Sequence, residues 1–218
     1  MKSGPKIERA SGITIIELVA IVIGLFLLAA VLLPYLARTG VQSDRIHCDS
    51  NLHQIGLSVK SWALDNYGNY PAQRPATNGG AMEFACTGNV ARVFEVMSNE
   101  LNSPKILVCP TDAKRVQASL FNNTLSNLNL SYFIGIDANE FSPAMFLSGD
   151  RNITTNSVQL SPGAVHLLRT NTFVGWTSGI HRNNGNVLIV DGSAQQWSNA
   201  ELRAGLRGSG TTNRIAVP

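Results

Sequence analysis

The sequence is poor in the side chains on which catalytic and nucleic-acid-binding proteins depend. Charged residues make up only 14% of the 218 residues, and no basic run interleaved with aromatic residues occurs, so we expect no nucleic-acid partner. Neither a Gly-x-Ser-x-Gly nor a His-Glu-x-x-His motif is present, which argues against a serine hydrolase and a zinc peptidase. Of the 4 histidines, we expect His47 and His53 to face solvent and His166 to lie in a strand. We therefore expect neither an enzyme nor a bound cofactor.

Cysteine is also scarce. The 3 cysteines, Cys48, Cys86 and Cys109, form no Cys-x-x-Cys pair, which disfavours a zinc site. If the domain lies outside the cytoplasm, we expect one disulfide and one remaining thiol, with either Cys48 or Cys86 bonded to Cys109. The alternative is that all three are buried as small apolar side chains.

Hydrophobic residues, in contrast, form one long run near the N-terminus. No polar side chain occurs from Leu18 to Leu33. A helix over 13–37 would be about 37 Å long at 1.5 Å per residue, enough to span a hydrocarbon core of about 30 Å. Three basic residues precede the run and predict a cytoplasmic N-terminus: Lys2, Lys6 and Arg9. A cleaved secretory signal peptide fits less well, because its apolar core would span about 7–15 residues and end in a small-x-small site.

One carboxylate, Glu17, stands at the start of this apolar run. A plain signal anchor explains the hydrophobicity and the preceding charges but not this acid, because an acid at the centre of a membrane helix costs roughly 2.5–3.5 kcal/mol. If the chain were cut between Gly12 and Ile13, the new α-amino group would lie four residues before Glu17, on the same helix face. Pairing of this amine with the carboxylate, within one chain or between neighbours, would make Glu17 an assembly device.

The segment SGITIIE resembles the type IV prepilin signature: a short basic leader ending in Gly12, an apolar first residue, Thr, two apolar residues and Glu17 as the fifth mature residue. The family commonly has Phe where Ile13 stands, and it often has a proline where Pro34 stands. The resemblance implies cleavage after Gly12 and N-methylation of Ile13 by a membrane prepilin peptidase. It also implies packing of the apolar helix with other pilin or pseudopilin subunits in a filament. Pro34 would loosen the helix for this packing, although membrane helices also simply tolerate proline.

The remaining pattern predicts an α+β fold. We expect a leader at 1–12, a transmembrane and assembly helix at 13–37, its amphipathic continuation at 38–67 and a globular domain at 68–218. The long N-terminal helix would pack on a C-terminal antiparallel β-sheet domain in a pilin-like arrangement. Apolar residues recur at helical spacing in the second half of the helix: Val41, Cys48, Leu52, Ile55, Val59 and Trp62.

Short apolar segments bounded by Asn, Gly, Pro and Ser predict strands after about residue 130: LSYFIGID, AMFLSGDR, AVHLLR, FVGWTSGIH, NVLIVDG and SAQQWS. The pairs Asn-Gly at 184–185 and Asp-Gly at 191–192 predict hairpin turns. Before the sheet we expect a loop at 72–88, a short helix at 89–101 and a buried strand in KILVCPTD. After it we expect a helix at 199–206 and a Gly-rich tail.

His181, followed after nine residues by Asp191 and Gly192, resembles the C-terminal signature of prepilin-processed proteins of planctomycetes and verrucomicrobia. The segments CPTD and FLSGDRNIT resemble the same group, and the segment CDSNLHQIGLSVKSWALDNYGNYP resembles a stretch of many pseudopilin-like proteins. Physically, we expect His181 to hydrogen-bond to the turn that begins at Asp191. The alternative is a calcium site with oxygen ligands from Asp150, Asp191, Asn183 and Asn186.

The sequence therefore predicts a structural subunit of a type II secretion pseudopilus or a type IV pilus-like filament. It would be a single-pass protein of the inner (cytoplasmic) membrane, with its globular domain periplasmic or extracellular. The alternative is a membrane-anchored binding module that does not polymerise and binds a cell-wall or polysaccharide ligand. Such a module needs an exposed aromatic platform, for which Trp176 and Trp197 are candidates, since Trp62 falls on the predicted core face of the helix.

Overall fold

The structure is a computed structural model that describes residues 14–122 and 124–218, without the side chains of 34–43. Gly12 and Ile13 lie outside the described residues, and of Pro34 only its place within a helix is described. The chain divides into two compact units, Met1–Ser43 and Asp44–Pro218, which are described separately below.

Helix α1 spans Ile15–Asp65. Its residues up to Ser43 belong to the first unit, and its residues from Asp44 onward belong to the second. In the second part, the predicted stripe from Cys48 to Trp62 is buried, with each of its members at most 5% exposed. The helix ends where Gly68, at φ +76°, donates its N–H to the carbonyl of Ala63. A glycine is suited to this position because it lacks the Cβ that penalises the left-handed region.

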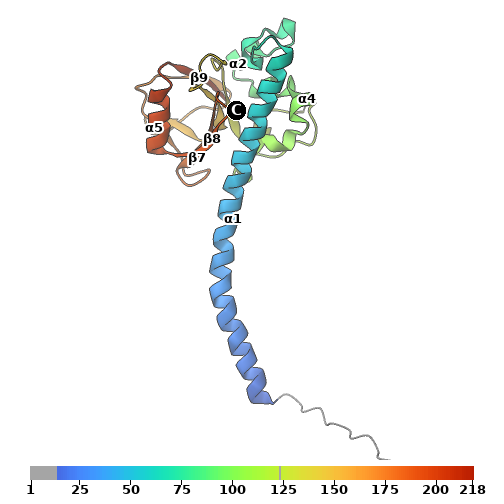
Figure 1. The fold of residues 1–218 in the computed structure, drawn as a ribbon, viewed down its shortest axis with the longest axis vertical. Helices are drawn as coiled ribbons and strands as arrows, with labels where there is room; N and C mark the ends of the chain where they lie inside the picture. The colour runs from blue at the N-terminus through green and yellow to red at the C-terminus, as the bar shows by residue number, and fades with distance from the viewer. Residues whose placement is uncertain (1–13, 123) are drawn as a thin grey trace, which may run out of the picture. The chain divides into compact units, whose positions relative to one another are not determined.

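Short helices connect α1 to the sheet (Figure 1): α2 Met82–Cys86, α3 Val90–Glu95 and α4 Ser98–Leu101, with 3₁₀ turns at Pro71–Gln73, Ala76–Asn78, Pro104–Leu107 and Asn127–Asn129. The loop predicted at 72–88 thus contains α2, and the single helix predicted at 89–101 is broken into α3 and α4. The strand predicted in KILVCPTD is wrong. Pro104 fixes a helical φ, and the Ser103 hydroxyl accepts the N–H of Lys105, so the segment begins as a capped helical turn.

The large sheet has six antiparallel strands in the order β5-β9-β1-β2-β7-β8. Their bounds are β1 Tyr132–Gly135, β2 Phe146–Asp150, β5 Ala164–Leu168, β7 Asn184–Ile189, β8 Ala194–Ser198 and β9 Asn213–Val217. A small sheet in the order β4-β3-β6 comprises β3 Ile153–Thr155, β4 Val158–Gln159 and β6 Val174–Trp176. All six predicted strand segments contain a strand, and the α+β prediction is confirmed.

The prediction of a Gly-rich tail after the last helix is wrong for the final residues of the chain. Residues 213–217 form β9, which pairs with β5 on one side and β1 on the other. Ile215, Ala216 and Val217 are each at most 2% exposed. The apolar IAV triplet follows a turn at Gly210, and its backbone groups are satisfied by both neighbours, so it forms an inner strand.

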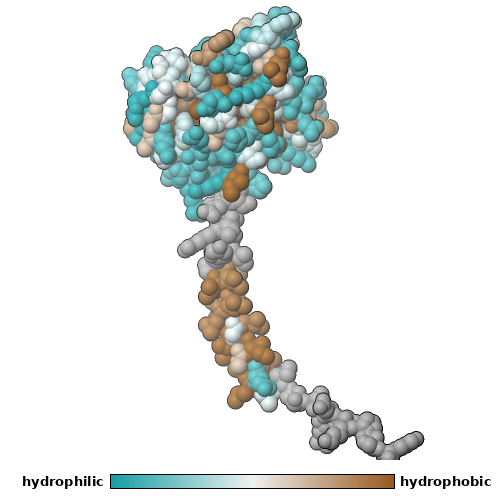
Figure 2. All heavy atoms as spheres, in the orientation of Figure 1, coloured by the Kyte–Doolittle hydropathy of each residue, from teal (hydrophilic) through white to brown (hydrophobic). Residues whose placement is uncertain are grey.

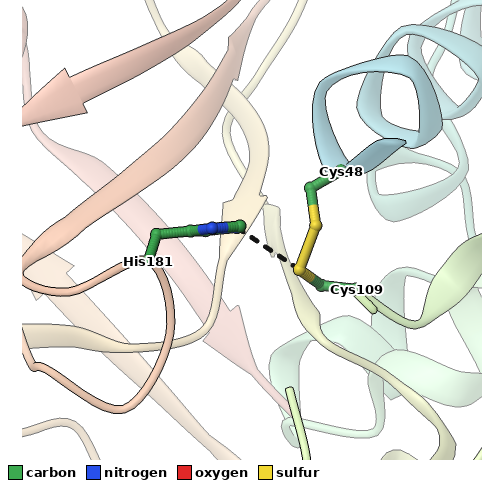
Figure 3. A group of neighbouring side chains, drawn as sticks. All are labelled: Cys48, Cys109 and His181. Atoms are coloured by element: carbon green, nitrogen blue, oxygen red, sulfur yellow. Dashed lines mark hydrogen bonds between the residues drawn. A yellow bond between two sulfur atoms is a disulfide. The ribbon is translucent and has the colours of Figure 1, made fainter. Parts of the chain in front are cut away.

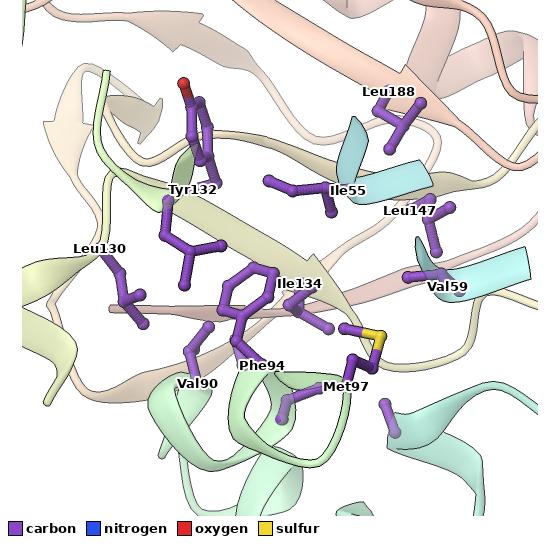
Figure 4. Close-up of a cluster of buried hydrophobic side chains, with 14 of the residues drawn as sticks. Ile55, Val59, Val90, Phe94, Met97, Leu130, Tyr132, Ile134, Leu147 and Leu188 are labelled. Carbon is purple, nitrogen blue, oxygen red and sulfur yellow. The ribbon is translucent and has the colours of Figure 1, made fainter. Parts of the chain in front are cut away.

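Two hydrophobic clusters cover the two faces of the large sheet. Alternate residues of β1 point to different clusters, as strand geometry requires: Tyr132 and Ile134 join the first, and Phe133 joins the second. The first cluster contains the buried stripe of α1 and side chains from the short helices, among them Val90, Phe94 and Met97 (Figure 4). The second contains Leu202 and Leu206 of helix α5, Asn199–Gly208, and residues of the small sheet.

Candidate functional site

The start of α1 is organised by Thr14 and Glu17. The backbone N–H of Thr14 donates to Glu17 Oε2 at 2.8 Å, and the Thr14 hydroxyl donates to the same oxygen at 2.9 Å. The N–H of Glu17 donates back to the Thr14 hydroxyl at 3.4 Å. This is a capping box, in which a Thr and a Glu three residues later satisfy each other's backbone donors. The motif Thr-Ile-Ile-Glu is visible in the sequence, and it gives Glu17 a role within its own chain that the sequence analysis missed.

The helix that follows this cap is apolar on every side. Ile15–Leu33 has a mean hydropathy of 3.0 with none of that window buried, and it is the one helix of the described residues long and apolar enough to cross a membrane. Figure 2 shows hydrophobic side chains on the visible face of this segment, whereas the surface of the globular unit is mostly hydrophilic. The chain therefore has one N-terminal helix that fits a single-pass membrane protein.

The other cluster of chemically reactive side chains lies inside the globular unit (Figure 3). Cys48 of α1 and Cys109, in the segment before β1, form a disulfide that joins residues 61 positions apart. Cys86 is a free, exposed thiol. Of the two pairings expected for an exported chain, the structure contains Cys48–Cys109.

His181 lies against this disulfide and is 5% exposed. Its Nε2 lies 3.3 Å from Cys109 Sγ, and its Nδ1 lies 3.4 Å from the hydroxyl of Thr111. The amide of Asn186 donates to His181 Nε2 at 3.2 Å, which assigns the ring proton of the neutral histidine to Nδ1. Burial, followed by the positive charge of Arg45, lowers the pKa of His181 to about 4.

Asp150 completes the cluster at the end of β2. It is fully buried, and its Oδ2 accepts the backbone N–H of Asn186 at 2.6 Å and the Asn186 side-chain amide at 3.1 Å. The same oxygen lies 3.5 Å from His181 Nε2, and Oδ1 has no hydrogen-bond partner among the described residues. Burial raises the pKa of Asp150 to about 7, so a protonated acid faces a neutral imidazole in mildly acidic solution.

The predicted contact between His181 and the Asp191 turn is wrong. Asn184 and Gly185 lie inside β7 rather than in a turn, and three consecutive residues from His181 to Asn183 adopt positive φ instead. This left-handed segment directs His181 inward to partners brought by β2 and by the segment around Cys109. Asp191 and Gly192 do form the hairpin turn between β7 and β8, and Lys60 of α1 donates to the Asp191 carbonyl at 3.0 Å.

The proposed calcium ligands are not brought together either. Asp150, at the end of β2, lies beside Asn186, whereas Asp191, in the turn after β7, donates its N–H to the carbonyl of Pro143, which precedes the opposite end of β2. Asp191 Oδ1 accepts the N–H of Ser193, and Asn183 is exposed. The calcium hypothesis for these residues is therefore wrong.

Comparisons with protein-family models, with curated proteins and with solved structures found no match.

The disulfide decides what the cysteine–histidine cluster can bind. The ligand atoms of Cys48, Cys109 and His181 all lie within 4.8 Å of one another, a spacing that suits a metal ion. Sulfur binds zinc as the thiolate, however, and both sulfurs are consumed by their covalent bond. In this oxidised form the cluster is a covalent link between α1 and the sheet domain, with His181 packed against it.

The tryptophans do not form the aromatic platform that a binding module would need. Trp62 and Trp176 are 5% and 4% exposed. Trp197 is half-buried and packs edge-to-face on Phe146, with ring centroids 5.8 Å apart. The indole rings thus pack in or against the core, and the prediction of an aromatic platform formed by Trp176 and Trp197 is wrong.

The Asp150–His181 pair predicts opposite pH dependence in two single variants. Between about pH 4 and 7 the native Asp150 holds a proton that the unfolded chain has lost, so its contribution to stability falls as pH rises. Between about pH 4 and 6.5 the unfolded chain binds a proton on His181 that the native state lacks, so the contribution of His181 rises with pH. In the parent protein these two opposite dependences of the unfolding free energy on pH cancel.

Relative to the parent, Asp150→Asn is expected to gain about 1.4 kcal/mol of unfolding free energy per pH unit between pH 4.5 and 6, and His181→Asn is expected to lose as much. Urea titrations of the full-length chain in detergent at four pH values would measure both differences. Subtracting the parent removes the contributions of all other titrating groups. Parallel curves for the parent and both variants would contradict the assignment of these two protonation states.

Proposed function

We propose that this chain is a prepilin-like structural subunit of a type II secretion pseudopilus or a type IV pilus-like filament. The observation that carries the proposal is an exposed apolar helix, Ile15–Leu33, that begins directly at the pair Thr14 and Glu17. In the prepilin signature the same residues follow the cleavage site, here Gly12. The supporting features are the basic leader and a globular unit rich in antiparallel sheet.

In this proposal the apolar helix has two successive environments. It first anchors the chain in the inner membrane, with the leader in the cytoplasm and the globular domain on the opposite side. Prepilin peptidase then removes the leader and methylates Ile13. The helix finally packs against the corresponding helices of other subunits, because its side chains are exposed all round and no part of the described chain covers them.

Mass spectrometry of the N-terminal peptide from cell membranes tests the processing step. The proposal expects a peptide that begins at N-methylated Ile13. An intact leader, in cells whose prepilin peptidase processes a reporter prepilin, would overturn the proposal and leave a plain signal-anchored domain.

Two substitutions of Glu17 separate its role in the helix cap from a role in assembly. Glutamine can replace glutamate in a capping box, so Glu17→Gln should keep the cap, membrane insertion and leader cleavage. It removes the negative charge, however, and we expect it to abolish most filament assembly in a shearing or cross-linking assay. Glu17→Ala should lose the cap as well, which weakens the first turn of the helix.

The comparison of the two variants decides the role of the charge. If Glu17→Gln assembles as well as the parent and Glu17→Ala does not, the carboxylate acts as a cap and pairing with a neighbouring amine is wrong. Immunoblots of the membrane fraction for both variants control for insertion and abundance.

A further inference from the structure

Two almost fully exposed aromatic rings of the globular unit line the same pocket. Tyr67 is 90% exposed and Phe141 is 97% exposed, the highest values among the described aromatic side chains. The pocket has a volume of about 580 Å³, which falls within the range of small-molecule sites of roughly 300–1,000 Å³. It lies between the end of α1 and the loop that follows β1, and its other lining side chains are polar: Asn69, Gln73, Asn139 and Glu140.

The backbone holds Tyr67 in place although the ring is not buried. Tyr67 has φ +59°, a left-handed conformation that is uncommon and strained for a bulky residue. The guanidinium of Arg74 lies 5.6 Å from the centroid of the Tyr67 ring, and an Arg74 N–H donates to the Asn66 carbonyl. Because 90% of the residue remains accessible, the ring face away from Arg74 is open to a ligand. Strain of this kind clusters at ligand-binding positions.

Phe141 is presented by a short hydrogen-bonded loop. Its N–H donates to Asn139 Oδ1 at 3.1 Å, and the N–H of Ser142 donates to the Asn139 carbonyl at 3.0 Å. Burying a phenylalanine side chain is favourable, and folding of the described chain leaves the Phe141 ring almost wholly in water. The ring is thus available to bury apolar surface of a partner molecule.

The polar groups around the rings define the chemistry of that partner. Gln73 Oε1 accepts the N–H of Tyr70, which leaves the Gln73 amide hydrogens as donors. The Asn69 amide donates to the Asn66 carbonyl, which leaves Asn69 Oδ1 as an acceptor. Glu140 is the one charged side chain that lines the pocket in the described part of the chain, and it repels anions.

We propose that this pocket binds a neutral oligosaccharide. A sugar ring has a face of C–H groups and a rim of hydroxyls that both donate and accept hydrogen bonds. The C–H face can lose contact with water against Tyr67 or Phe141, and the hydroxyls can pair with Gln73, Asn69 and Glu140. An acidic sugar is disfavoured because the Glu140 carboxylate lines the described pocket, whereas Arg74, the cation beside Tyr67, is outside the lining and donates to the carbonyls of Asn66 and Asn78.

Isothermal titration calorimetry tests the site with the full-length chain in a zwitterionic detergent that has no sugar headgroup. The probes are cellohexaose, xylohexaose, mannohexaose and chitohexaose, with hexagalacturonate as the anionic comparison. We expect at least one neutral probe to bind, and we expect Tyr67→Asn and Phe141→Ala each to weaken it by about tenfold or more. Asparagine suits the left-handed backbone, so Tyr67→Asn should melt no lower than the parent.

Phe173→Ala is the matched control, because it removes another partly exposed ring, 50% exposed and stacked on Arg203, that does not line the pocket. It should leave sugar binding unchanged. The proposal is overturned if no neutral probe binds at millimolar concentration, if hexagalacturonate binds as tightly as the best neutral probe, or if Phe173→Ala weakens binding as much as Tyr67→Asn. Self-association that Tyr67→Asn abolishes, without sugar binding, would instead assign the surface to a second copy of the chain.

Discussion

Arg151→Met is expected to lower the free energy of unfolding by about 3–5 kcal/mol, because it leaves the carboxylate of Asp112 buried without its cation. The guanidinium donates to both oxygens of Asp112 at 2.7 Å, and the side chains are 9% and 2% exposed. Ser131 donates to the same carboxylate at 3.0 Å. The pair ties the segment after Cys109 to the end of β2. Denaturant titration of the full-length chain in detergent measures the loss.

Arg214→Met provides the matched control. Arg214 also forms a forked pair, with Asp137, but those side chains are 47% and 27% exposed. Water can solvate the Asp137 carboxylate when this surface pair is removed. Arg214→Met should therefore lower the free energy of unfolding by no more than about 1 kcal/mol.

A double variant tests whether the unpaired charge of Asp112 causes the loss of stability in Arg151→Met. Asp112→Asn combined with Arg151→Met removes both charges, and the double variant should be more stable than the sum of the single losses predicts by at least about 1 kcal/mol. If the losses simply add, the effect of Arg151→Met is one of packing, and a stranded charge does not explain it.

The double substitution Cys48→Ala and Cys109→Ala is expected to destabilise the chain by about 2–5 kcal/mol. The disulfide closes a loop between positions 61 apart, and its loss frees the unfolded chain to explore many more conformations. Both cysteines are at most 1% exposed, so the substitution also leaves a small cavity beside His181. The melting temperature should fall by roughly 10 °C.

Cys86→Ala controls for the chemistry of the substitution, because Cys86 is exposed and unbonded. It should change the melting temperature by no more than about 2 °C. The parent treated with a thiol reductant under denaturing conditions and then refolded should resemble the double variant. Equal stability of the parent and the double variant would show that the link between α1 and the segment before β1 adds nothing to the fold.

Periodic burial explains which elements could be predicted. The stripe from Cys48 to Trp62 recurs every three or four residues, and alternate residues of β1 serve opposite faces of the sheet, so both patterns are local and readable. The strand β9 was missed because its first residues, Asn213 and Arg214, are polar and follow a glycine-rich turn. Asn213 is nevertheless 1% exposed, since its side chain accepts the N–H of Phe146 from a distant strand.

The candidate sites also differ in whether a local sequence motif or contacts between distant residues form them. The Thr14–Glu17 cap spans three residues and was present in the sequence as a known motif. The surroundings of His181 were not predictable, because Cys109 and Asp150 lie 72 and 31 positions away and no local pattern links them. Likewise, the exposure of Tyr67 and Phe141 depends on loop backbones that hydrophobic periodicity does not describe.

The position of β9 also sets an order in time for folding. Asn213–Val217 comes last among the described elements, yet it lies between β5 and β1. Until it has left the ribosome, those two strands have no shared partner, and the facing edges of both remain open to pairing with other chains. The six-stranded sheet of a newly synthesised chain is therefore complete only when this last described strand is available.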